Sequence, residues 1–139
     1  ANFSLGVTVF EEVLKQITPI LKDSFDIEVI EKHHNKKLDA PSGTAKMLVE
    51  AIDPDHEFER VYGRSGASKR GKEIGVHALR GGTIVGEHSV IFAGEDEVFE
   101  IKHEAHSKNI FVNGAIKAAE FLVGKPAGLY IMHDVLFSK

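Results

Sequence analysis

The most informative stretch of this chain is Glu31-Lys32-His33-His34-Asn35-Lys36-Lys37-Leu38-Asp39-Ala40-Pro41-Ser42-Gly43-Thr44-Ala45. It follows an alternating apolar segment, residues 26–31, which predicts a β-strand, and it precedes a segment with helical periodicity. Pro41 and Ser42 suit a helix entrance, because proline presets the backbone of the first turn and serine caps free N–H groups. The stretch therefore predicts a strand, a loop rich in His and Lys, and a helix start.

A helix start of this kind is also suited to anions, because its free backbone N–H groups and the helix dipole favour negative charge. Gly43 lets a ligand approach the backbone closely, and the hydroxyl groups of Ser42 and Thr44 add donors. Ordinary capping by Ser42 is the alternative interpretation, and it is compatible with anion binding.

The two histidines come at the end of the predicted strand, where successive side chains point to opposite faces, so we expect His33 and His34 to differ in task. Lys37 can reach the same ligand from the loop, either countering a carboxylate or donating a proton. Together these residues predict a pocket for a small, multiply anionic substrate that must also be protonated. Because the chain has eight histidines, a surface or packing role for each remains an open alternative.

Composition narrows the class of protein. The 139 residues suffice for one domain, and 42% are hydrophobic, which is enough for a core. Lys and Arg are spread along the chain, whose net charge is −4, so no nucleic-acid surface is expected. The absence of cysteine excludes disulfides and thiolate chemistry and fits a reducing cytoplasm. No apolar run approaches the ~20 residues of a membrane span, and no signal peptide is recognisable.

The first half predicts two helices around the strand. Residues 4–22 form the first, with Ser4 as its N-cap and Pro19 as a kink or stop near its end. Its apolar face would comprise Phe10, Val13, Leu14, Ile17 and Leu21. The second helix would begin at Ser42 and bury Ala45, Met47, Leu48, Ala51 and Ile52. The polar, glycine-rich residues 53–74 are interpreted mostly as a long loop.

The second half predicts mainly strands, over residues 75–80, 87–93 and 97–104, with a hairpin turn at Gly94-Glu95-Asp96. Residues 107–123 predict a helix that ends before Gly124. Its buried stripe would comprise Phe111, Ala115, Ala118, Ala119 and Leu122. The apolar residues 129–136 are interpreted as a final strand. The pattern as a whole predicts an α+β domain with one mostly β layer and helices packed on it.

Other motifs are weaker. The glycines of Arg80-Gly81-Gly82 and Gly86-Glu87-His88 indicate a tight connection, but neither a dinucleotide-binding fingerprint nor a P-loop is present. His103, Glu104 and His106 resemble metal-ligand spacing only loosely. A metal-dependent hydrolase built on His33, His34 and His103 is accordingly the least favoured alternative.

The opening stretch resembles the signature of the 4-hydroxy-tetrahydrodipicolinate reductase (dihydrodipicolinate reductase) family of lysine and diaminopimelate biosynthesis. The matching pattern is Glu31-x-His33-His34-x-x-Lys37-x-Asp39-Ala40-Pro41-Ser42-Gly43-Thr44-Ala45. Further blocks are similar at residues 1–7, 64–71, 74–75, 79–82, 86–88, 113–115 and 128–136. The resemblance thus covers essentially the whole chain.

This resemblance implies an open mixed β-sheet with helices packed on one face, the fold of the substrate-binding and oligomerisation domain of a two-domain dehydrogenase. Residues 1–139 would be the C-terminal domain, and the N-terminal Rossmann domain that mainly binds NADPH or NADH would be absent. Four copies would pack sheet to sheet into a cytoplasmic homotetramer. The choice between NADH and NADPH would depend on the absent domain.

The implied reaction is NAD(P)H-dependent reduction of 4-hydroxy-tetrahydrodipicolinate to tetrahydrodipicolinate, coupled to loss of water. By resemblance, His33 would be the general acid/base and Lys37 the second proton donor. The substrate carboxylates would be bound by His34, Ser42, Gly43 and Thr44. The nicotinamide end of the cofactor would be touched by Ala1, Asn2 and Phe3, and no metal is implied. The alternative is a catalytically incomplete module that oligomerises and binds dicarboxylates.

Overall fold

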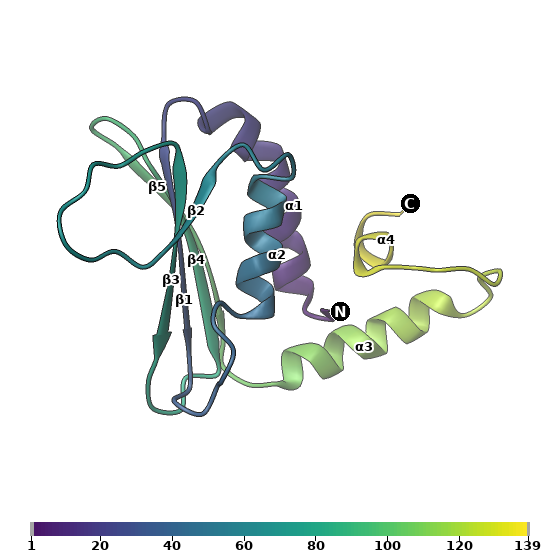
Figure 1. The fold of residues 1–139 in the computed structure, drawn as a ribbon. Coiled ribbons are helices and arrows are strands. Elements are labelled where there is room, and N and C mark those ends of the chain that lie inside the picture. Colours follow the sequence, from purple (N-terminus) through teal and green to yellow (C-terminus); the bar gives the residue numbers. More distant parts are fainter. Residues whose placement is uncertain (1, 139) are drawn as a thin grey trace.

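The computed structural model describes residues 2–138 as a five-stranded mixed sheet with helices α1 and α2 on one face (Figure 1). The strands are β1 (Asp26–His33), β2 (Glu59–Tyr62), β3 (Glu73–Arg80), β4 (Gly86–Ala93) and β5 (Val98–Ala105). The helices are α1 (Leu5–Leu21), α2 (Gly43–Ile52), α3 (Asn109–Leu122) and α4 (Met132–Phe137). The predicted α+β class with a one-sided open mixed sheet is confirmed.

The strand order is β2-β3-β1-β4-β5, which puts β1 at the centre of the sheet. β1 runs parallel to β3 and antiparallel to β4, and β4 and β5 form the predicted hairpin. The register sets Glu31 opposite His88, and His88 opposite His103. Because side chains opposite each other share a face, this register aligns three polar side chains on the helix-covered face.

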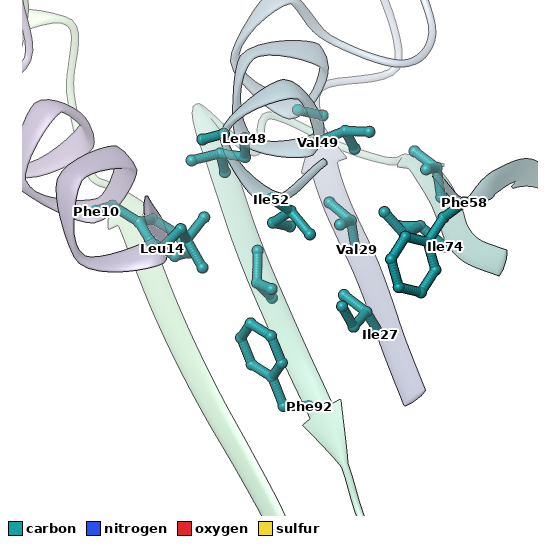
Figure 2. Close-up of a cluster of buried hydrophobic side chains, with 14 residues drawn as sticks. Phe10, Leu14, Ile27, Val29, Leu48, Val49, Ile52, Phe58, Ile74 and Phe92 are labelled. Atoms are coloured by element: carbon teal, nitrogen blue, oxygen red, sulfur yellow. The ribbon is translucent and has the colours of Figure 1, made fainter. Parts of the chain in front are cut away.

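The hydrophobic core lies between this face of the sheet and the two helices, as Figure 2 shows. Alternate residues of β1, Ile27 and Val29, are fully buried there. Leu14 of α1 and Leu48 of α2 pack against them and are also fully buried. Each such side chain contributes about 1.5–3 kcal/mol relative to an exposed one, so this cluster fixes α2 on the sheet.

Both helices of this layer begin at a buried serine. The Ser4 hydroxyl accepts a hydrogen bond from Val7 N, which confirms the predicted N-cap of α1. The Ser42 hydroxyl likewise accepts from Ala45 N at the start of α2. α1 continues through Pro19 to Leu21, so the proline lies inside its last turn. No helix within residues 2–138 is long and apolar enough to cross a membrane.

The prediction of a loop over residues 53–74 is wrong in part, because residues 59–62 form β2 at the edge of the sheet. The buried carboxylate of Asp53 accepts hydrogen bonds from Glu57 N and Phe58 N, and the Phe58 ring joins the core. After this turn, β2 pairs with β3 over only four residues. Four residues are too few to show a clear alternation of apolar and polar positions in the sequence. The following loop projects from the sheet (Figure 1).

The prediction of a strand over residues 129–136 is wrong: these residues lead into α4. The Asp134 carboxylate accepts a hydrogen bond from Ile131 N and so caps the helix start. The apolar run in residues 129–136 has the composition of a buried strand. In the structure, its second part forms the short helix α4, which lies near α1.

The predicted stripe of α3 is also mostly wrong, since this helix extends away from the sheet (Figure 1). Among its residues only Gly114 and Ala118 are buried, whereas Phe111 and Leu122 are 41% and 46% exposed. The end of the helix agrees with the prediction, because Gly124 adopts a positive φ of 75° just beyond it.

Candidate active site

A cavity of about 540 Å³ opens where β1 ends and α2 begins. Its lining residues are Asn2, His33, His34, Lys37, Ser42, Gly43, Thr44, Met47, Val85, Lys108 and Phe111. β1 supplies the two histidines, the following loop supplies Lys37, and the start of α2 supplies residues 42–44. The structure therefore brings together the residues that the sequence predicted to transfer protons and to bind anions.

The His33 ring is held in place by two neighbouring side chains, those of Glu31 and His88. Its Nδ1 lies 2.6 Å from the Glu31 carboxylate, and the ring meets that of His88 edge to face at 5.2 Å between centroids. Its Nε2 lies close to the backbone of Gly86, where any side chain would crowd it. Because an ionised carboxylate only accepts hydrogen bonds, Nδ1 is the donor, and Nε2 is the nitrogen left for a ligand.

Glu31 is fully buried, yet it is charged. Burial acts to raise its pKa, but hydrogen bonds from Arg80, His33 and the Ser42 backbone outweigh burial, so the pKa of this carboxyl lies below its ordinary value. The Arg80 guanidinium binds it in a two-pronged fork, with both N···O distances 2.7 Å. Glu31 therefore remains an anion behind His33 at physiological pH.

Lys37 is held over the cavity by the turn that follows β1. Its backbone N–H donates to His34 O, and its ammonium group lies 2.8 Å from the Asp39 carboxylate. This ammonium group lowers the pKa of Asp39 below its usual range, so the pair is charged. Lys37 can thus offer a cation to an anionic ligand, with Asp39 as its partner in the free protein.

At the start of α2, the Ser42 side chain already has hydrogen-bond partners, whereas Gly43 is open to solvent. The Ser42 hydroxyl caps Ala45 N and lies 2.8 Å from His88 Nε2, so it is engaged inside the protein. Gly43 faces open space, because apart from its chain neighbours and its own helix backbone no atom lies within 4 Å of where a Cβ would lie. Since the first N–H groups of a helix have no partner within it, the backbone at Gly43 and Thr44 is the exposed donor surface.

Of the three residues predicted to touch a nucleotide, Asn2 lines the cavity and its side chain accepts from Ser4 N. Phe3 is not part of the lining, and its carbonyl packs against Gly114 of α3. Ala1 lies outside the described residues.

Four lining residues were not predicted as site residues: Met47, Val85, Lys108 and Phe111. Lys108 and Phe111 belong to the start of α3, about 75 residues along the chain from the histidines, and no local pattern links them to the loop. Met47 lies one helical turn after Gly43, so helical spacing alone was a usable signal. Lys108 adds another cation to the cavity wall.

Within residues 2–138 no three His, Asp or Glu side chains are placed to hold a metal ion. His103 lies against Gly6 of α1 and is not among the lining residues of the cavity. The three histidines of the hydrolase hypothesis therefore do not converge.

The structure is thus a one-sided mixed sheet with a cavity at the end of its central strand, lined by histidines, lysines and a helix start. The family model described as "Dihydrodipicolinate reductase, C-terminus" matches residues 6–136, and the chain belongs to this family.

Named relatives agree with this membership. The 4-hydroxy-tetrahydrodipicolinate reductase of Clostridium novyi is 52% identical over 100% of this chain and 56% of its own length. Those of Brachyspira hyodysenteriae and Methanosarcina mazei are 54% and 51% identical, over 98% and 97% of this chain and 60% and 51% of their own lengths. The chain therefore spans little more than half the length of these curated relatives.

A solved structure shows the same fold: the dipicolinate-bound dihydrodipicolinate reductase from Paenisporosarcina sp. TG-14. It matches with a TM-score of 0.78 and 22% sequence identity, over 98% of this chain and 53% of that chain.

Proposed function

We propose that this chain is the substrate-binding half of a 4-hydroxy-tetrahydrodipicolinate reductase in lysine and diaminopimelate biosynthesis. The reaction reduces 4-hydroxy-tetrahydrodipicolinate to tetrahydrodipicolinate with loss of water. The observation that carries the proposal is the convergence of His33, His34, Lys37 and the α2 start on one cavity. Family membership and the named relatives supply the reaction.

The cavity suits a ring that bears two carboxylates. One carboxylate would lie against the backbone N–H groups of Gly43 and Thr44, next to His34. Lys37 would counter the other carboxylate and act as the second proton donor, exchanging Asp39 for the ligand. His33 would act as the general acid/base through Nε2. Ser42 would contribute mainly by holding the helix start in place, because its hydroxyl already has partners.

NADH or NADPH would supply the hydride. Residues 2–138 offer no glycine-rich turn between a strand and a helix to cradle its diphosphate, and only Asn2 of the expected contacts lines the cavity. We therefore assign nucleotide binding to sequence that the relatives carry beyond the matched half, with Ala1, Asn2 and Phe3 near the nicotinamide end.

A catalytically incomplete, dicarboxylate-binding module is the second candidate. The lack of a dinucleotide-binding turn within residues 2–138 favours it, because reduction requires a hydride donor held against the ring. Oxidation of NADH or NADPH by the 139-residue chain in the presence of substrate separates the two: turnover supports the complete activity, and binding without turnover supports the module.

Calorimetric titration with pyridine-2,6-dicarboxylate, a planar mimic of the substrate, tests the binding site. We expect binding by the unaltered chain, weakened at least about tenfold by His34→Ala and by Lys37→Ala, because each removes a hydrogen-bond donor to a carboxylate. His106→Ala and Lys32→Ala are the controls, since neither side chain lines the cavity. A well-folded chain that does not bind, or controls that weaken binding equally, would contradict the assignment.

A further inference from the structure

We propose that Glu31 and Arg80 are positioning residues that keep a proton on His33 Nδ1, so that His33 exchanges protons with a ligand only through Nε2. Neither residue lines the cavity, and both act through the imidazole in front of them. The inference deepens the proposed function and rests on it for the ligand, whereas the proton's position on His33 is a property of the free chain.

The first support is that every hydrogen-bonding position of the Glu31 carboxylate is filled. Oε1 accepts from Arg80 Nη2 at 2.7 Å and from Ser42 N at 2.9 Å. Oε2 accepts from Arg80 Nη1 at 2.7 Å and from His33 Nδ1 at 2.6 Å. Four donors around two oxygens prevent the carboxylate from rotating. Its orientation therefore fixes the plane of the His33 ring.

The second support is the double attachment of Arg80. The same guanidinium group that binds Glu31 also donates from Nη2 to Asp39 O at 2.7 Å. Asp39 is the partner of the Lys37 ammonium group, so one arginine holds the supports of both proposed proton donors. Lysine has a single ammonium group and cannot reproduce this fork.

The third support is the charge around His33. Glu31 is the carboxylate in contact with its ring, from the same strand. His88 approaches from β4, and burial and the neighbouring charge of His33 lower its pKa to about 4, so it remains neutral. The charged or titratable groups elsewhere in the cavity wall are His34, Lys37 and Lys108. Among these neighbours, an acceptor for a ring proton is available to Nδ1 only at Glu31.

These contacts define one proton route. In the cationic imidazole the Nε2–H bond breaks and its proton passes to the ligand, leaving a neutral ring with the proton on Nδ1. In the reverse direction the Nε2 lone pair takes a proton from the ligand or water. Glu31 remains an anion throughout and stabilises the cationic form of the ring.

Nitrogen NMR of the chain labelled with ¹⁵N-histidine tests this arrangement, with His33→Asn used to assign the signal. We expect neutral His33 to be the Nδ1–H tautomer. In Glu31→Gln the amide has one oxygen for the four donors. Ser42 N cannot give up its proton, whereas His33 can move its own, so the amide oxygen turns to Ser42 and the NH₂ group to His33. His33 should then switch to the Nε2–H tautomer.

The matched control is Glu28→Gln, three residues earlier on β1. Glu28 is also bound by two arginines and a histidine, Arg64, Arg70 and His77, but on the opposite face of the sheet. Its replacement should leave the His33 tautomer unchanged. Arg80→Lys is a second variant in case Glu31→Gln fails to fold, and it should give a mixture of both tautomers.

An Nε2–H tautomer in the unaltered chain would overturn the inference, as would an unchanged Nδ1–H tautomer in both Glu31→Gln and Arg80→Lys. Loss of dicarboxylate binding is scored separately, by the titration with pyridine-2,6-dicarboxylate. The correct tautomer without binding would refute the proposed ligand alone, and binding with the wrong tautomer would refute this inference alone.

Discussion

His88 lies buried on β4 between the Ser42 hydroxyl and the ring of His33. Burial, followed by the charge of His33, lowers its pKa from 6.5 to about 4, and the anion of Glu31 acts in the opposite direction. His103, its cross-strand neighbour, also has a pKa lowered by burial. Neutral His88 and His103 therefore lie in the interior, behind a cavity wall that contains Lys37 and Lys108.

This arrangement predicts an acid-sensitive fold. Because the pKa of His88 is lower in the folded chain than in the unfolded chain, the unfolded chain binds more protons in acid. The contribution of neutral His88 to the free energy of unfolding is therefore complete above pH 6.5 and is lost as the pH falls toward 4. The shift corresponds to about 3 kcal/mol of unfolding free energy. Denaturant unfolding between pH 7 and pH 4.5 should show a steeper loss for the unaltered chain than for His88→Gln. Equal slopes would mean that the pKa of His88 is the same in the folded and unfolded chain.

The individual site residues were predictable only where they are close in sequence. The loop with His33, His34 and Lys37 was recognisable because strand, loop and helix start follow one another within fifteen residues. Glu31 and Glu28 are both glutamates of β1, three residues apart. Glu31 is fully buried on the helix-covered face, whereas Glu28 lies on the opposite face of the sheet. Arg80 reaches Glu31 from β3 through strand register, which a single sequence does not reveal.

At the scale of elements, the start of α2 connects the fold to the site. Ser42 caps the helix, receives support from His88, and its backbone N–H donates to Glu31. Ser4 caps α1 in the same way and is equally buried, but has no histidine partner. The two serines thus form a natural pair in which one cap carries an additional contact.

We expect Ser42→Ala to cost about 2 kcal/mol of unfolding free energy and Ser4→Ala about 1 kcal/mol, because a helix cap and a buried hydrogen bond are each worth about 1 kcal/mol. Chemical denaturation of both variants measures the difference directly. Equal losses would show that the contact between Ser42 and His88 adds no stability to the folded chain.

Prediction of whole elements succeeded where periodicity was long. α1, α2 and strands β1, β3, β4 and β5 have clear alternation or helical spacing and were found within two residues of their observed ends. β2 is short and depends on the buried turn at Asp53, and α4 depends on a cap by Asp134 rather than on its apolar content. The predicted buried stripe of α3 assumed a packing surface that the described residues do not provide.

At the scale of the molecule, α1 and α2 cover one face of the sheet, and no helix within residues 2–138 covers the other (Figure 1). That second face is mixed: Ile30 and Ile91 lie partly buried among charged side chains such as Glu28 and Glu100. Single-face coverage is common for antiparallel pairs, but a partly apolar open face favours a partner. This supports the proposal that copies of the chain associate through it, as implied for a homotetramer.

Ile91→Lys tests this association. Ile91 is in register with Glu28 and Glu100, so in a single copy the new ammonium group gains carboxylate neighbours and the fold is retained. Between two packed sheets the same charge would lose its water, at a cost of several kcal/mol. Sedimentation velocity should therefore show a tetramer for the unaltered chain and smaller species for Ile91→Lys. Val9→Lys, on the outer side of α1, is the control and should remain tetrameric. An Ile91→Lys protein that still sediments as a tetramer would place the interface elsewhere.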